Sequence, residues 1–416
     1  MFKMKKLGLW ALVGMVGVAM FAQAAEPCEK CAHQALLKKL PEIFNASAVH
    51  YKALDAAATP LVDKGKDGMK QVPHGFDRKA GRLDMRNINW WTTGHYPGSL
   101  WYLYEATKDD FFKERALYWT RLLEPNKTDD SHHDTGFIMY CSYGNMDRIL
   151  NTTEGYPILL ETAASLSRRF NPELGVLRSW GHKNDKKHFL VIPDNMMNLE
   201  MLEWASKAPG GDKRFDEIAR SHADKTMENH FRVDGGTYHV LDYDQKMVGR
   251  IQAIERGQGA GCVTAWSRGQ SWGIYGYTMM YRETGKADYL AFAQKLADYA
   301  INHPNMPADG VPYWDFGAPG EERDTSAASI MASALIELSD FVKGEKGKAY
   351  FDYAVKQLTS LASPEYFTKP GEQGDWLLKH GVGHKPQGTE VDTPLDYGDY
   401  YFLEALLRFQ KAMANR

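Results

Sequence analysis

Two aspartates stand in sequence contexts that suit chemistry better than surface solvation. Asp134 lies in S-H-H-D-T-G-F, and Asp194 follows an Ile-Pro pair in V-I-P-D-N-M-M-N-L. A general acid must hold its proton near neutral pH, which requires a carboxyl group with a raised pKa. Burial among apolar side chains and a second carboxylate nearby both raise that pKa. The two residues are therefore candidates for acid–base catalysis if the fold brings them together.

Each aspartate also has a simpler interpretation. Both precede a run with helical periodicity, where an aspartate commonly caps the first-turn N–H groups, and capping lowers the carboxyl pKa. The run H-H-D suggests in addition a metal site made of His132, His133 and Asp134. Adjacent side chains in a turn rarely converge on one ion, so metal binding is the weaker hypothesis.

Four further candidates lie later in the chain. Arg268, in S-R-G-Q-S-W, has the planar fork that binds a substrate carboxylate, or alternatively bridges two buried segments. Trp272 follows one helical turn later and offers either a flat ring for a sugar or core packing. His239 and Gln258 are polar candidates in the long connection before this helix. Each is ambiguous alone, and only assembly in one pocket gives them a common role.

Helical periodicity dominates the elements that must position these residues. Helices are predicted over residues 34–55, 97–107, 109–124, 134–146, 153–169, 194–207, 213–230, 266–284, 287–303, 324–342, 347–362 and 397–413. Several are joined in pairs by short polar or glycine-containing turns. The longer connections between them are rich in Trp, His, Asp and Gly, which is typical of functional loops.

Six successive helix pairs predict an all-α fold, a closed (α/α)6 barrel that forms one catalytic domain over residues 34–416. A single pair cannot bury its apolar face, whereas closing the ring buries the faces of all of them. One end of such a ring collects the long loops and the N-termini of the inner helices, so polar residues there share a pocket. Asp134 and Asp194 are one helix pair apart, which predicts that they are neighbours across it.

The composition disfavours some classes of protein. The 416 residues are 44% hydrophobic and 25% charged, the balance of an ordinary globular protein. The formal net charge is -3 and no long basic run occurs, so nucleic acid is not an expected partner. Aromatic residues make up 12% of the chain, which suits stacking on sugars as well as filling a large core.

The N-terminus has the pattern of a bacterial export signal. Three lysines precede a short apolar stretch and the motif A-Q-A, which predicts a signal peptide over residues 1–24 and a flexible tail over 25–33. The apolar stretch is short for a membrane span. The mature protein is expected in the periplasm or outside the cell, without membrane attachment.

Cysteine usage is sparse. Cys28 and Cys31, in C-E-K-C, either form a disulfide in an oxidising compartment or belong to a mobile tail without a role. A zinc site would need a second pair at matching spacing, and the sequence has none. Cys141 and Cys262 are predicted to be buried small apolar residues.

Seven motifs occur in an order that resembles the unsaturated glucuronyl hydrolases, glycoside hydrolase family 88. They are W-T-T-G-H-Y-P-G-S-L-W, H-D-T-G-F, I-P-D-N-M-M-N-L, R-G-Q-S-W-G-I-Y-G, P-Y-W-D-F, D-T-S-A-A-S-I and Y-G-D-Y-Y-F-L-E-A-L. The resemblance spans residues 88–406 and implies an (α/α)6 barrel. It implies removal of 4,5-unsaturated glucuronic acid from the non-reducing end of lyase-generated oligosaccharides of the glycosaminoglycan type. In that reaction C4 of the double bond is protonated, water adds at C5, and the hemiketal opens and expels the aglycone, with no metal or organic cofactor.

The resemblance also implies roles for matching residues. Asp194 is expected to be the general acid/base, and Asp134 its partner, which orients the ring and helps to hold the proton. Arg268 and Trp272 resemble the contact to the substrate carboxylate and a stacking platform. Trp91 matches a tryptophan beside the pocket.

His239 and Gln258 fall where the family places polar contacts, although their local match is looser. His95 stands where the family pattern leads us to expect Phe, which affects the shape of this wall and not the chemistry.

Two other functions remain open at this point. An unsaturated rhamnogalacturonyl hydrolase, acting on pectin fragments, would share the barrel and the chemistry. A non-catalytic glycan-binding toroid would keep the aromatic residues and could lose a carboxylate, and the presence of both Asp134 and Asp194 disfavours it.

Overall fold

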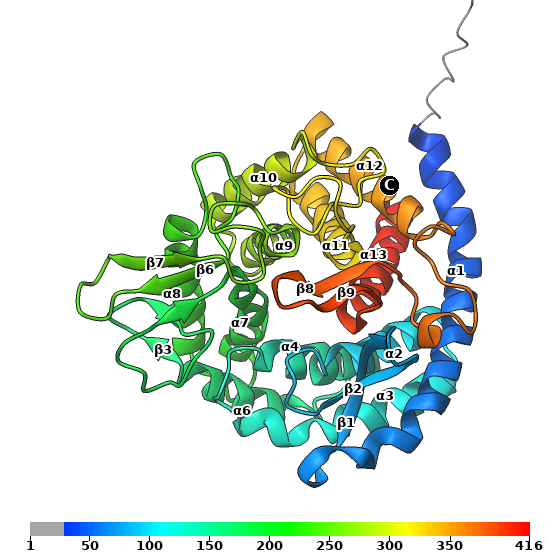
Figure 1. Cartoon of the computed structure of the whole chain (residues 1–416), viewed down its shortest axis with the longest axis horizontal. Coiled ribbons are helices and arrows are strands. Elements are labelled where there is room, and N and C mark those ends of the chain that lie inside the picture. Colours follow the sequence, from blue (N-terminus) through cyan, green and yellow to red (C-terminus); the bar gives the residue numbers. More distant parts are fainter. Residues whose placement is uncertain (1–28) are drawn as a thin grey trace, which may run out of the picture.

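Helices alternate between an outer and an inner layer of one ring throughout residues 29–416, the part of the chain that the computed structural model describes (Figure 1). The outer layer contains α1 (Glu29–Ala58), α3 (Asp110–Leu122), α6 (Tyr156–Ser167), α8 (Arg214–Asn229), α10 (Ala287–Ile301) and α12 (Gly344–Leu361). The inner layer contains α2 (His95–Thr107), α4 (Thr135–Met139) with α5 (Asn145–Leu150), α7 (Leu199–Lys207), α9 (Ser267–Thr284), α11 (Thr325–Phe341) and α13 (Asp396–Asn415). The predicted all-α (α/α)6 barrel is confirmed.

The inner helices are buried on every side. In α11 the run T-S-A-A-S-I-M-A-S-A-L-I is buried without a break, and the first nine residues of α2 are buried as well. A helix that is apolar or small all round can be stable only inside a second layer, and the outer helices supply that layer. The side chain of Asp324 caps α11 by accepting a hydrogen bond from the N–H of Ser326, at 3.0 Å.

The ring closes where the two ends of the chain meet. Helix α13 packs against both α2 and α11, and α1 packs against α12. Tyr51 of α1 donates a hydrogen bond to Asp399 of α13, at 3.2 Å. Tyr102 of α2 donates one to Glu404 of α13, at 2.9 Å. These polar contacts thus reinforce the apolar packing that joins the first hairpin to the last.

Two inner segments are not regular α-helices. The chain passes from α4 to α5 through a π-helical turn at Tyr140–Gly144, and a 3₁₀ turn at Pro193–Asn198 precedes α7. The sequence analysis predicted plain helices in both places. Such departures from α geometry are frequent at functional sites, and the 3₁₀ turn contains Asp194, whereas Asp134 lies just before α4.

Short antiparallel strands occupy the long connections, where the sequence analysis predicted none. They are β1 (Gln71–Asp77) with β2 (Arg82–Asn87), β3 (Phe170–Asn171) with β4 (Val176–Leu177), β5 (Leu190–Val191) with β6 (Val240–Tyr243) and β7 (Ile251–Glu255), and β8 (Gly381–His384) with β9 (Thr389–Thr393). Except for β1 and β2, the strands have two to five residues, which is too short for alternation to stand out in the sequence. The β8–β9 hairpin lies over the middle of the ring (Figure 1).

The predicted signal peptide, residues 1–24, and Cys28 lie outside the described residues. Helix α1 begins at Glu29, so the last residues of the predicted tail are helical. Among the helices that the structure describes, none has the length and apolar character needed to cross a membrane.

Cys141 and Cys262 differ in their surroundings. Cys141 is buried, as predicted, in the π-helical turn. Cys262 is exposed, so the prediction of burial was wrong there. It lies in an irregular loop between β7 and α9, where no second layer covers it.

Candidate active site

A pocket of about 360 Å³ opens at the end of the ring where the inner helices begin. It is lined by Trp90, Trp91, His133, Asp134, Trp180, Ile192, Asp194, Gln258, His384, Gln387, Thr389 and Glu390. Of the predicted site residues, Trp91, Asp134, Asp194 and Gln258 line it. The structure thus brings residues from distant parts of the chain to one cavity, as the barrel prediction requires.

A close approach of two backbone segments makes the aspartates neighbours. Asp134 immediately precedes α4, and Asp194 lies in the 3₁₀ turn before α7. The N–H of Phe137 donates a hydrogen bond to the side-chain oxygen of Asn198, at 2.9 Å. A Cβ atom at Gly136 would lie only 2.6 Å from that same oxygen, so glycine is required for this approach. The motifs H-D-T-G-F and I-P-D-N-M-M-N-L therefore contact each other directly.

Neither carboxylate is used as a helix cap. Asp134 occupies the N-cap position of α4, yet its side chain makes no capping hydrogen bond. Asp194 lies inside its 3₁₀ turn, whose N-cap is Ile192. The Oδ2 atom of Asp194 is buried and has no hydrogen-bond partner among the described residues. The capping interpretation is therefore not supported for either residue, and both side chains are available to the pocket.

Asp194 has the protonation behaviour of a general acid. Its side chain is almost completely buried, and burial raises the pKa of Asp194 to about 7, although the nearby Arg268 opposes this effect. The negative charge of Asp134 adds to the increase, because two neighbouring carboxylates resist being ionised together. The acid and its conjugate base are consequently both accessible near neutral pH.

Asp134 is ionised under the same conditions. Burial disfavours its charge, but His133 and His132 more than compensate and keep the pKa of Asp134 below its ordinary value. His132 lies with one ring nitrogen 3.4 Å from Asp134 and the other 3.4 Å from Asp129. Burial opposes protonation, yet these two carboxylates raise the pKa of His132 to about 9.

Asp194 therefore keeps its proton to a higher pH than Asp134 does. This is the pattern expected when one carboxyl group serves as the acid and the other as its charged partner. The surroundings of His132 also bear on the H-H-D metal hypothesis. The N–H of Asp134 donates to Nδ1 of His132, at 3.1 Å, and Nε2 lies 3.4 Å from Asp129, so both ring nitrogens face groups of the protein.

His239 faces the general-acid candidate as a neutral donor. Its Nδ1 accepts the N–H of Gln258, at 2.8 Å, so the ring proton is on Nε2. Burial lowers the pKa of His239 well below its ordinary value, and the positive charge of Arg268 acts in the same direction. The Nε2 atom lies 3.9 Å from Oδ2 of Asp194, and neither atom has a hydrogen-bond partner among the described residues. The gap between them suits a bridging water or sugar oxygen.

Arg268 does not reach the pocket surface. Its guanidinium is completely buried and donates hydrogen bonds to the carbonyls of Val382 and Gly383, the latter at 2.9 Å. Asp324 lies 3.5 Å away. The geometry matches the alternative interpretation, a buried arginine that joins two segments, here the start of α9 and strand β8. A direct contact with substrate is not what this arrangement offers, because the guanidinium is completely buried and is not part of the pocket lining.

Trp272 is likewise enclosed. Its ring is completely buried between those of Phe137 and Tyr401, with ring centroids 5.2 and 5.3 Å away. It presents no face to the pocket, so the stacking role predicted for it does not fit, whereas core packing does. Its indole N–H points towards Asp194 and weakly opposes the increase in the pKa of that carboxyl group.

Trp91 forms part of the wall, as predicted, with its ring packed on Tyr397 at 5.1 Å. His95 lies behind it and is completely buried among aromatic rings. Burial lowers the pKa of His95 to about 3, and its Nδ1 donates to the carbonyl of Thr92, at 2.8 Å. His95 is thus a neutral flat ring where the family pattern led us to expect Phe, and it supports the same wall.

The sequence analysis did not single out several lining residues. They are Trp90, Trp180, Gln387, Thr389 and Glu390. Three of them belong to the β8–β9 hairpin, whose turn carries the Pro and Gly of K-P-Q-G. The residues K-P-Q-G predict a turn, but no local sequence pattern indicates that the hairpin folds back over the centre of the ring.

Comparison with known proteins decides the family. A curated relative from Formosa agariphila, named unsaturated glucuronyl hydrolase, is 42% identical over 324 residues, covering 77% of this chain and 80% of the relative. The chain belongs to the unsaturated glucuronyl hydrolases. The enzyme is therefore a glycosidase, and the resemblance inferred from the seven motifs is confirmed. No family model matches the chain.

Two further relatives agree with this assignment. An unsaturated chondroitin disaccharide hydrolase from Streptococcus pyogenes is 32% identical over 330 residues, covering 77% of this chain and 81% of the relative. The crystal structure of an unsaturated glucuronyl hydrolase specific for heparin is 39% identical, with a TM-score of 0.82 over 89% of this chain and 98% of that one. These names fit the glucuronyl hydrolase interpretation and not the pectin-directed or non-catalytic alternatives.

Proposed function

We propose that this pocket removes 4,5-unsaturated glucuronic acid from the non-reducing end of oligosaccharides that lyases release from glycosaminoglycans. The observation that carries the proposal is the pair of neighbouring buried carboxyl groups, Asp194 with its pKa raised to about 7 and Asp134 ionised. The relatives named for chondroitin disaccharides and for heparin support the glycosaminoglycan class.

In the first step, Asp194 transfers its proton to C4 of the double bond. The ring carbon C5 then becomes electron-poor, and positive charge is shared with the ring oxygen. The ionised Asp134 lies on the same pocket wall and stabilises this charge, because a fixed carboxylate in a buried site needs no reorganisation. His133 and His132 lower the pKa of Asp134 and so keep this carboxylate from taking the proton itself.

In the second step, water adds to C5. Asp194 is now a carboxylate and accepts a proton from that water, which restores the acid for the next turnover. The gap between Asp194 and the Nε2–H of His239 can hold the water oxygen, since His239 donates and Asp194 accepts. The hemiketal formed at C5 opens and expels the aglycone, so one water molecule is consumed overall.

Other residues act through position and charge. Trp90 and Trp91 offer flat surfaces to a sugar ring at the pocket wall. Arg268 lies close enough to the pocket for its positive charge to lower the pKa of both Asp194 and His239. We propose that it attracts the uronate carboxylate through this field, without contacting it, while holding strand β8 in place.

The test is turnover of lyase-generated unsaturated disaccharides, followed by loss of the ultraviolet absorbance of the conjugated double bond. Asp194→Asn should lower kcat by about 10²–10⁴-fold, the usual contribution of a general acid, with substrate binding retained. Asp147→Asn is a matched control, because Asp147 is also buried, has its pKa raised by burial to about 6 and leaves its Oδ2 unpaired, yet lies outside the pocket. A near wild-type rate for Asp194→Asn would overturn the assignment, and so would an equal loss in the control.

A further inference from the structure

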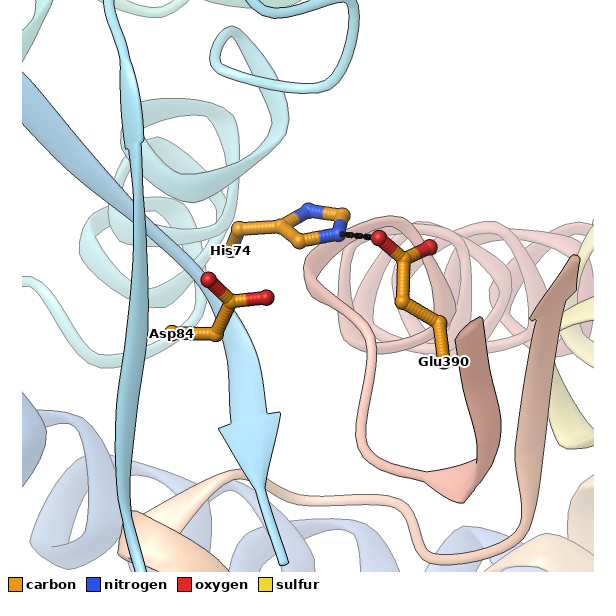
Figure 2. A group of neighbouring side chains, drawn as sticks. All are labelled: His74, Asp84 and Glu390. Atoms are coloured by element: carbon orange, nitrogen blue, oxygen red, sulfur yellow. Dashed lines mark hydrogen bonds and ion pairs between the residues drawn. The ribbon is translucent and has the colours of Figure 1, made fainter. Parts of the chain in front are cut away.

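Glu390 lines the pocket, but the proposed reaction does not use it. It lies on strand β9 and belongs to a cluster with His74 and Asp84 from the β1–β2 hairpin (Figure 2). The Nε2 atom of His74 lies 3.0 Å from Oε1 of Glu390. Arg86 donates to the same Oε1, at 3.0 Å, and to Asp84, at 2.7 Å. Two side chains thus fix one oxygen of this carboxylate.

The cluster is better explained by hydrogen bonds than by a metal ion. Ligand atoms of His74, Asp84 and Glu390 lie within 4.8 Å of one another, which by itself would allow a cation. However, the Arg86 guanidinium already bridges the two carboxylates. Burial disfavours protonation of His74, but Glu390 and Asp396 raise the pKa of His74 to about 10, so its ring carries both protons. Both ring nitrogens of His74 also have hydrogen-bond partners, Oγ1 of Thr92 at 2.8 Å and Oε1 of Glu390 at 3.0 Å.

The second oxygen of Glu390 remains available to a ligand. None of the hydrogen bonds found among the described residues uses Oε2, and Figure 2 shows it turned away from His74. It lies beside Gly383, where an added Cβ would come within 2.1 Å of it. The lack of a side chain at Gly383 therefore leaves room for the carboxylate in this position.

Glu390 gives this wall of the pocket an acceptor that cannot donate. Burial disfavours its charge, but His74 and Arg86 hold the pKa of Glu390 at about 2, so it is ionised at every working pH. None of the described residues that line the pocket is a lysine or arginine. A hydroxyl group can donate to such a carboxylate, whereas a sulfate ester has only acceptor oxygens and a negative charge.

We propose that Glu390 is a specificity-determining residue that accepts a hydrogen bond through Oε2 from one free hydroxyl of the substrate and selects against a sulfate ester at that position. His74 and Arg86 are positioning residues for this carboxylate. The hydroxyl belongs either to the unsaturated uronate or to the sugar attached to it, and substrates sulfated on one or the other ring distinguish the two.

The experiment compares kcat/KM for unsaturated disaccharides that differ by a single sulfate. In the wild type, one sulfate position should lower kcat/KM by about 10- to 100-fold, the range expected for a lost charge-assisted hydrogen bond. Glu390→Gln keeps an oxygen for His74 and Arg86 and turns an N–H towards the pocket. This variant should reduce the penalty at that one position by about tenfold or more, and it should leave the penalties at other positions unchanged.

Asp84→Asn is the matched control, because it removes one negative charge from the same cluster at a residue that does not line the pocket. It should leave the ratio of sulfated to non-sulfated turnover unchanged. An equal reduction of the sulfate penalty in Asp84→Asn would overturn the direct contact. A wild type that hydrolyses every sulfated isomer equally well would also overturn it. The role of Glu390 depends on the proposed reaction, and wild-type turnover of the non-sulfated disaccharide tests that reaction separately.

Discussion

The stability of Asp194→Asn relative to the wild type should increase as the pH rises. In the folded protein the pKa of Asp194 is raised from its ordinary value of 3.8 to about 7, mainly by burial. The folded state therefore binds this proton more tightly than the unfolded chain does. The stabilisation is complete below about pH 4 and is lost as the pH rises to about 7. Each pKa unit corresponds to about 1.4 kcal/mol, so the whole loss is at most about 4 kcal/mol.

The Asn variant cannot ionise and does not suffer this loss. Relative to its value near pH 4, the difference in free energy of unfolding between Asp194→Asn and wild type should grow by about 1.4 kcal/mol per pH unit and level off above about pH 7. Urea unfolding at a series of pH values measures this difference. Other buried carboxyl groups, such as Asp399 with its pKa raised to about 7, titrate in both proteins and cancel.

Catalytic activity should decrease as Asp194 ionises. The wild type needs protonated Asp194, so kcat/KM should fall about tenfold per pH unit above about pH 7. A stability difference that does not change between about pH 4 and 8 would refute the reasoning, because Asp194 would then titrate alike in folded and unfolded chains. Its selection as the general acid would lose its physical basis.

Two further outcomes are expected. Asp134→Asn should move the alkaline limb of the kcat/KM profile to lower pH, because removing the neighbouring negative charge makes Asp194 easier to ionise; an unmoved limb, in whatever activity remains, would show that the two carboxyl groups are not coupled. Chelators should leave turnover unchanged, because the ring nitrogens of His132 already face Asp129 and the N–H of Asp134, and Arg86 bridges the carboxylates beside His74; inhibition that added metal reverses would contradict both assignments.

Local sequence determined the helical frame and indicated Asp134 and Asp194 as the candidate pair. Apolar periodicity predicted all twelve helical segments, because each helix must bury apolar side chains at helical spacing and that requirement is visible within a short window. The contexts of Asp134 and Asp194 were readable for a related reason. Each lies at the start of an inner segment, and six consecutive hairpins can bury their apolar faces only by closing into a ring. Closure then brings successive inner N-termini together.

Tertiary structure alone decided which polar side chains face the pocket. Arg268 and Trp272 have helical spacing that suits a site, yet β8 and the core rings enclose them. Glu390 has no local signal, and the folding of its hairpin over the ring placed it on the wall. The protonation states of Asp194 and Asp134 could not be established from the sequence either. Their pKa values depend on burial and on charges contributed by other helices and loops. Such contacts exist only once the ring has closed.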